Sequence, residues 1–260
     1  MKRDLRVVLK KLDRPPSGPN WVRFVCDEPD RTTKAILAFA KGIPPFTYRP
    51  GYVAAKDRLE LHIGRDAGIQ IALTKGSPAG RIQNKEFVEA FFDYDDVRRF
   101  SLSNPVEFET GLFRISRDVV VPVSPLSVIR EHGAFVAIFV CGWNSNPLSL
   151  NQRRLLATIS DDAFLSLTDF QKSPAEFLFF PKVGEGEDRK REPEVWQRGD
   201  YELLPKPALD RCVEIFLTAR EAARTILLEE IAKEDERRRR EGEPSEVDRP
   251  ERSGDLFSKK

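Results

Sequence analysis

Few side chains in this 260-residue chain could do nucleophilic or acid–base chemistry, since it contains only two histidines and three cysteines. Catalysis by a Cys/His pair needs a thiolate beside a base. His132 and Cys141 stand at the two ends of one apolar stretch. A strand of that length would hold them roughly 25 to 30 Å apart, at about 3.3 Å per residue. We therefore interpret Cys141 as a buried core cysteine and keep a catalytic Cys141 as the alternative.

A small acidic cluster, Asp93, Asp95 and Asp96, provides carboxylates that could hold Mg²⁺ together with a substrate phosphate. An EF-hand loop starting at Asp93 would need a glycine at its sixth position and a glutamate at its twelfth. Arg98 and Asn104 stand there instead. The end of a helix exposed to solvent is the simpler interpretation, and we expect no metal site.

His62 has charged neighbours on its predicted strand, so it could serve as a solvent-facing general base. Two histidines leave few ligands for a transition metal. The chain also has no Gly-Lys-Ser/Thr phosphate loop and no Gly-x-Ser-x-Gly nucleophile elbow. We expect no cofactor. An enzyme that uses His62, the acidic cluster or Cys141 is thus an alternative hypothesis, and it requires these residues to converge in one cleft.

The strongest clue to a ligand is a basic N-terminal region. Residues 1–60 contain 13 basic and 7 acidic residues, although the whole chain has 43 basic and 42 acidic residues and a net charge of +1. We expect Arg6 and Lys10 on one strand, and Trp21 and Arg23 on one face of the next. Cations beside an aromatic ring suit single-stranded nucleic acid, because they offer charge for phosphates and a plane for base stacking. Nucleic-acid binding is therefore an alternative function, although an ordinary polar sheet face explains the same pattern.

The last residues contain a second candidate for binding. Leu256 and Phe257 form an apolar island in a charged tail. Such an island can dock in a hydrophobic groove of a partner, and chance composition is the competing explanation.

The elements that would position these residues are expected to be mostly strands in the first two thirds of the chain. Apolar and polar residues alternate in 4–12, in 21–26 and twice within 58–75, which predicts two strands and a hairpin. A short helix is expected over 32–41, with Thr32 or Thr33 as its cap and Gly42 as its end.

A second short helix is predicted to begin at Asn84 and to end at the acidic cluster, because Phe87/Phe91 and Val88/Phe92 form i,i+4 pairs. Further strands are expected at 106–115, 119–123, 133–141 and 177–180. Residues 134–141 are all apolar, which predicts a central strand covered on both faces.

The C-terminal third is expected to contain a linker, a helix and a tail. Residues 182–206 are polar and charged, which is typical of a loop or linker. Apolar residues recur at steps of three and four through 207–232, which predicts a long amphipathic helix that packs against the body. Residues 233–260 carry nine basic and nine acidic residues, which predicts a frayed or disordered tail.

Together these patterns predict an α+β fold with a mostly antiparallel, β-rich body over 1–181, short helices, and the long C-terminal helix packed against it. The three cysteines are widely spaced, odd in number and never in a C-x-x-C pair, which fits a reducing compartment best. No apolar run reaches the roughly 18 residues of a membrane span. We expect a cytoplasmic protein without membrane contacts. The favoured function is a non-enzymatic binding or adaptor protein with a protein partner, as one subunit of a larger assembly.

Overall fold

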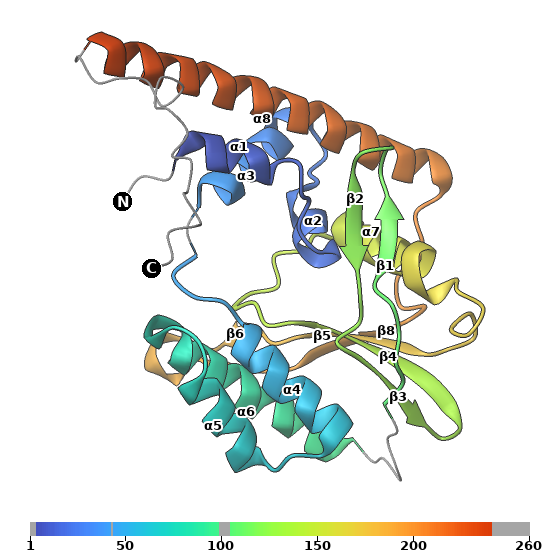
Figure 1. The fold of residues 1–260 in the computed structure, drawn as a ribbon. Coiled ribbons are helices and arrows are strands. Elements are labelled where there is room, and N and C mark those ends of the chain that lie inside the picture. Colours follow the sequence, from blue (N-terminus) through green and yellow to red (C-terminus); the bar gives the residue numbers. More distant parts are fainter. Residues whose placement is uncertain (1–3, 43, 99–104, 241–260) are drawn as a thin grey trace, which may run out of the picture.

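The structure, a computed structural model, describes residues 4–42, 44–98 and 105–240 and arranges them in layers around a four-stranded sheet (Figure 1). The helices are α1 (Leu5–Lys11), α2 (Gly18–Phe24), α3 (Pro29–Lys41), α4 (Arg49–Leu61), α5 (Arg65–Thr74), η1 (Pro78–Gly80), α6 (Arg81–Val97), α7 (Leu150–Ser160), η2 (Asp161–Leu165), η3 (Gly186–Asp188) and α8 (Lys206–Arg240). The strands are β1 (Gly111–Arg114), β2 (Val120–Val123), β3 (Ser127–Glu131), β4 (Ala134–Cys141), β5 (Ala175–Phe179), β6 (Lys182–Val183), β7 (Lys190–Arg191) and β8 (Glu194–Gln197). Helix accounts for 54% and strand for 15%, so the α+β class is confirmed, with more helix in the body than the sequence pattern predicts.

The main sheet has the strand order β3-β4-β5-β8. Neighbouring strands are antiparallel except for β4 and β5, which are parallel with Ala137 opposite Ala175. A parallel pair needs a crossover connection, and α7 with η2 provides it. The central position predicted for 134–141 is confirmed, because β4 lies between β3 and β5.

Each face of this sheet carries its own hydrophobic core. Ile138 of β4 faces a core made with α4, α5 and α6, whose largest side chains include Phe87 and Phe91. Phe139 faces the opposite core, which includes residues of α2, α7, η2 and α8. The predicted i,i+4 pairs of α6 are all buried, although Asn84 lies inside the helix and donates to Gly80 O rather than capping the helix.

The hairpin predicted over 58–75 is wrong, because these residues form the end of α4 and the whole of α5. Leu59 is fully buried, whereas Leu61 is 68% exposed, so the two do not share a strand face. His62 ends α4 in the left-handed conformation, with φ of 56°. At Gly68, an added Cβ would lie 2.7 Å from the ring of Phe92, which explains a glycine at the contact between α5 and α6.

The strands predicted over 4–12 and 21–26 are also wrong, because they are α1 and α2. Val8 is fully buried and Val7 is 51% exposed, as expected for a helix with its apolar face toward α8. The helix predicted over 32–41 is confirmed as the greater part of α3. It begins earlier, at Pro29, so Thr32 and Thr33 lie within it and bond back to carbonyls four residues earlier.

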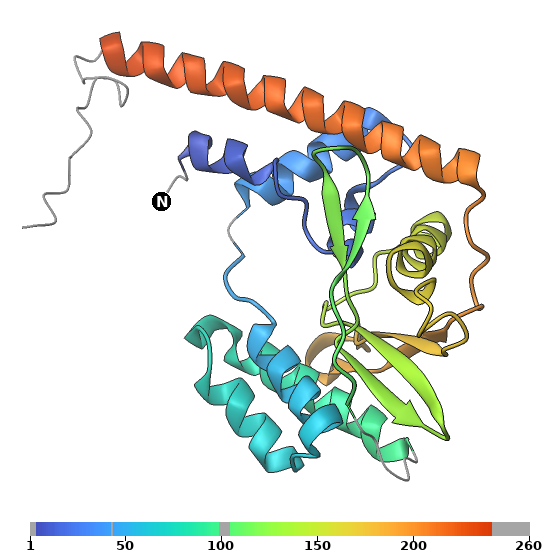
Figure 2. The same ribbon diagram turned by 45° about the vertical axis from the view of Figure 1, so that its right-hand side comes forward.

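The long C-terminal helix is confirmed as α8, which crosses the N-terminal helices (Figure 2). Its 35 residues span roughly 50 Å at about 1.5 Å per residue. It continues past the predicted end at 232 because α1 lies beside it, where Arg6 pairs with Asp235 at 2.9 Å. Arginines 237–240 in the last turn also interact favourably with the helix dipole.

The segment predicted as a linker, 182–206, contains the strands β6, β7 and β8. Within the described part of the chain, no helix combines the length and apolar character that crossing a bilayer requires.

Candidate binding groove

The residues predicted for nucleic-acid binding do not form an aromatic and basic face. Trp21 is fully buried, and its ring centroid lies 5.5 Å from that of Phe216, so its ring cannot stack on a base. Arg6 is paired with Asp235 of α8, and Arg23 stacks on Trp143, with 5.4 Å from its guanidinium carbon to the ring centroid. The predicted sheet face is thus corrected: its residues stand on α1 and α2, and its aromatic member is part of the core.

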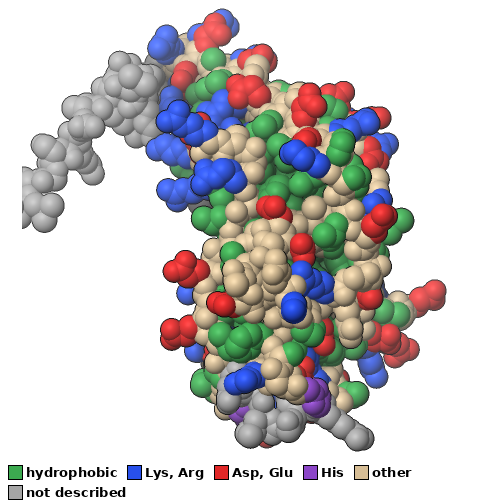
Figure 3. Space-filling model, turned by 90° about the vertical axis from the view of Figure 1, so that its right-hand side faces the viewer, with side chains coloured by type: hydrophobic (Ala, Val, Ile, Leu, Met, Phe, Trp, Pro, Cys, Tyr) green, Lys and Arg blue, Asp and Glu red, His purple; other side chains and the backbone are tan. Residues whose placement is uncertain are grey.

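Figure 3 shows how charged side chains are distributed over one face of the molecule. Lys and Arg side chains gather toward its upper end, and Asp and Glu side chains are interspersed with them. Positive and negative groups alternate over the rest of that face, rather than forming one continuous basic surface.

Cys141 is buried at the end of β4. Its burial raises the pKa of the thiol far above the usual value. A nucleophilic cysteine needs a lowered pKa, so the environment supports the interpretation of a core cysteine. His132 lies in the turn between β3 and β4, with φ of 46°.

The acidic cluster lies against two arginines from the neighbouring helices. Arg65 contacts Asp93 at 2.7 Å and Asp96 at 2.8 Å, and Arg58 contacts Asp95 and Asp96. Burial raises the pKa of Asp95, and the Arg58 guanidinium opposes this shift. The cluster therefore joins α4, α5 and α6 electrostatically.

His62 belongs to the end of α4, three residues before Arg65, and Cys141 belongs to the sheet. Among the described residues, no three His, Cys, Asp or Glu side chains are arranged to hold a metal ion. Leu256 and Phe257 lie outside the described residues.

A buried arginine occupies the place where open parallel sheets usually bind ligands, beyond the carboxyl ends of the strands. Arg191 is 1% exposed in its side chain. It donates to three carbonyl oxygens, at 2.8 to 3.2 Å, and to two side-chain oxygens, Tyr48 Oη at 2.9 Å and Asn144 Oδ1 at 2.5 Å. The carbonyls belong to Gly142, Trp143 and Phe180. This crevice is filled by the protein itself.

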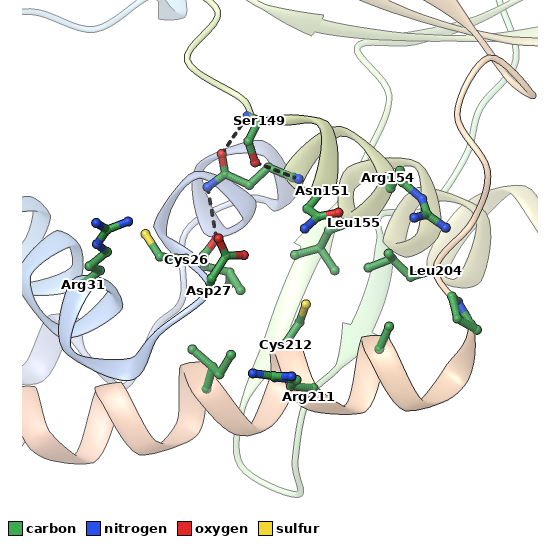
Figure 4. A pocket seen from close by; sticks show the side chains of 15 residues that line it. Cys26, Asp27, Arg31, Ser149, Asn151, Arg154, Leu155, Leu204, Arg211 and Cys212 are labelled. Atoms are coloured by element: carbon green, nitrogen blue, oxygen red, sulfur yellow. Dashed lines mark hydrogen bonds between the residues drawn. The ribbon is translucent and has the colours of Figure 1, made fainter.

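A groove of 640 Å³ lies where three elements meet: the α2–α3 connection, the first turn of α7 and the first turns of α8 (Figure 4). We call it the α7–α8 groove. Its volume is in the range of ligand-binding pockets. Apolar side chains line much of it, namely Val25, Leu155, Leu204, Ala208 and Ile215.

Side-chain hydrogen bonds hold the walls of the α7–α8 groove in place. Ser149 and Gln152 form a capping box at the start of α7. The Gln152 side-chain amide also donates to the carbonyl oxygens of Val22, Arg23 and Val25, at 3.0 to 3.2 Å. These residues lie in the last turn of α2 or just after it. Because one side chain caps two helix ends, the walls from α2 and α7 are fixed relative to one another.

The rim of the groove is predominantly cationic. Arg31 and Arg211 are exposed and form no side-chain hydrogen bond or ion pair with any residue that the structure describes. Arg154 contacts the Glu202 carboxylate at 3.0 Å, and Asp27 supplies one carboxylate to the lining. The start of α7 lies at the same rim and adds the positive end of its dipole.

Two half-buried thiols, Cys26 and Cys212, also line the groove. Burial raises the pKa of Cys212, and the nearby Asp27 carboxylate raises it further. No sequence spacing points to these two cysteines or to Arg31 and Arg211, because they come together only through tertiary packing. The one local signal is Ser149-x-x-Gln152, the capping-box pattern that precedes α7.

Comparisons of the chain with protein-family models, with curated proteins and with solved structures find no match.

Proposed function

We propose that the protein is a non-enzymatic binding protein of the cytoplasm, and that the α7–α8 groove holds an acidic, apolar segment of a partner protein. The observation that carries this proposal is the combination of an apolar lining with two rim arginines, Arg31 and Arg211, that have no carboxylate partner among the described residues. The three cysteines are free, as expected in a reducing compartment.

The chemistry of the groove defines the segment that fits it. Leu204 and Ala208 are partly exposed in the lining and can pack against leucine, isoleucine or phenylalanine side chains. A carboxylate beside Arg31 or Arg211 would form a charge-assisted hydrogen bond, which is stronger than a neutral one. Acidic and apolar residues in one short segment therefore satisfy both parts of the groove.

The first experiment measures binding of a fluorescent octapeptide of alternating Glu and Leu residues to the full chain. We expect saturable binding that the R31E/R211E double variant weakens at least about tenfold, because it replaces attraction with repulsion. The matched control is R81E/R117E, which makes the same charge change at exposed arginines that lie outside the lining of the groove. The control should bind like the parent chain.

Alkylation of the two groove thiols by a maleimide gives an independent readout. A bound peptide should slow labelling of Cys26 and Cys212, while buried Cys141 should stay unlabelled in the folded chain. Equal affinity of the parent chain and R31E/R211E would overturn the proposal. So would protection of these thiols by octanoate but not by the peptide, which would assign the groove to small anionic amphiphiles.

A further inference from the structure

The segment 105–110, which leads into β1, belongs to no helix or strand and lacks a strand partner along most of its length. Val106 N donates to Val128 O at 3.0 Å, which places its start beside the edge strand β3. Glu107, Phe108 and Glu109 make no backbone hydrogen bond with any residue in the described ranges. Unpaired backbone beside the edge of a sheet is a template for pairing with another chain.

A second groove, of 690 Å³, lies between this segment and the turn that follows η2. We call it the Phe108 groove. Its lining includes three aromatic side chains, Phe108, Phe135 and Phe170, and the ring centroids of Phe135 and Phe170 lie 6.2 Å apart. Leu167, at its margin, is 47% exposed. The unpaired backbone therefore borders an apolar surface that can receive side chains.

The charge of the Phe108 groove is opposite to that of the α7–α8 groove. Three exposed carboxylates line it, those of Glu107, Glu109 and Asp169, and none forms an ion pair with a described residue. Arg130 stacks on Phe135 at its edge, 5.9 Å from the ring centroid. The carboxylates outnumber this cation, so a positively charged segment is favoured here.

We infer that the Phe108 groove is a second docking surface, which takes an extended segment of a partner protein with alternating apolar and Lys or Arg residues. Such a segment pairs with the backbone of Glu107–Glu109 as an added strand, a recurrent mode of peptide recognition. Because side chains alternate along a strand, its apolar residues reach Phe108 and Phe135 while its cations face Glu107 and Glu109.

The probe for this inference is a fluorescent octapeptide of alternating Lys and Val residues, titrated against the full chain. We expect saturable binding that E107K/E109K weakens at least about tenfold and that added salt weakens as well. E192K/E229K makes the same charge change at exposed glutamates elsewhere and should bind like the parent. An unchanged melting temperature of E107K/E109K would show that the variant is folded.

Two further peptides separate strand pairing from simple charge attraction. N-methylation at alternate residues removes backbone donors, so the methylated peptide should lose binding if it pairs as a strand. A Glu–Val octapeptide should not compete for this groove. Equal binding of the methylated peptide, or equal weakening by E192K/E229K, would overturn the inference.

Discussion

The guanidinium group of Arg191 is buried and surrounded by oxygen atoms. Its two terminal nitrogens donate hydrogen bonds to five oxygen atoms, and its Nε lies 3.9 Å from a Glu86 carboxylate oxygen. Its Nε forms no hydrogen bond with a described residue, so the hydrogen bonds of the two terminal nitrogens stabilise the buried charge. Its removal leaves the same acceptors buried without donors, which costs more than the net value of each bond.

We therefore expect Arg191→Met to lower the free energy of unfolding by about 3 kcal/mol or more. Arg191→Lys should cost less than Met, because it keeps the charge but loses the planar fork. Urea denaturation measures both, with the exposed neighbour Arg189→Met as control, expected within about 0.5 kcal/mol of the parent. A Met variant as stable as the control would contradict the buried-network description.

The Cys212 thiol gives a pH-dependent test of the α7–α8 groove. Its pKa is raised by burial and by Asp27, so Asp27→Asn should lower that pKa and increase the thiolate fraction at pH 8. The pH profile of alkylation, resolved by mass spectrometry, should move to lower pH for Cys212, while buried Cys141 stays unreactive. An unmoved Cys212 profile would show that Asp27 does not act on this thiol.

At the scale of elements, the sequence predicts α8 well and α1 poorly, and the reason is length. A long run at steps of three and four fits only a helix, whereas α1 has seven residues. There Leu5, Val7 and Leu9 satisfy the period of two, while Leu5, Val8 and Leu12 satisfy the helical period. Only the folded chain decides between the two periods, because Val8 is buried there and Val7 is exposed.

The pattern over 58–75 is ambiguous in the same way, because it fits a hairpin as well as the helices α4 and α5. Gly64 fits a hairpin loop as well as a break between helices, and the structure uses it as the N-cap of α5. In contrast, β4 is predictable because an all-apolar stretch of eight residues suits a central strand. The α7–α8 groove could not be predicted, because its lining comes from three separate stretches of the sequence, 25–31, 149–155 and 204–215.

The face that α8 buries can be tested with two adjacent leucines. Leu227 is fully buried and Leu228 is 49% exposed. Leu227→Ala should lower the free energy of unfolding by about 2 to 4 kcal/mol, and Leu228→Ala by less than about 0.5 kcal/mol. Thermal or urea unfolding compares them directly, and equal effects would mean that α8 does not pack through this face.

For the whole molecule, the two cores share one sheet, so they should unfold together. All three tryptophans, Trp21, Trp143 and Trp196, belong to or pack against the core that contains α2 and α7. We expect the urea transition seen by tryptophan fluorescence to coincide with that of amide protection in α6, which lies on the other face. Separate midpoints would show that α4–α6 unfold independently.

The crossover formed by α7 and η2 also sets the distance between the two grooves. The α7–α8 groove lies at its first turn and the Phe108 groove beyond its last residue, so its 16 residues hold them roughly 24 Å apart, at about 1.5 Å per residue. A flexible linker reaches that span at about 20 residues. An acidic and a basic segment joined by such a linker would bind with avidity, and a much shorter linker would abolish this gain because both ends could not engage at once.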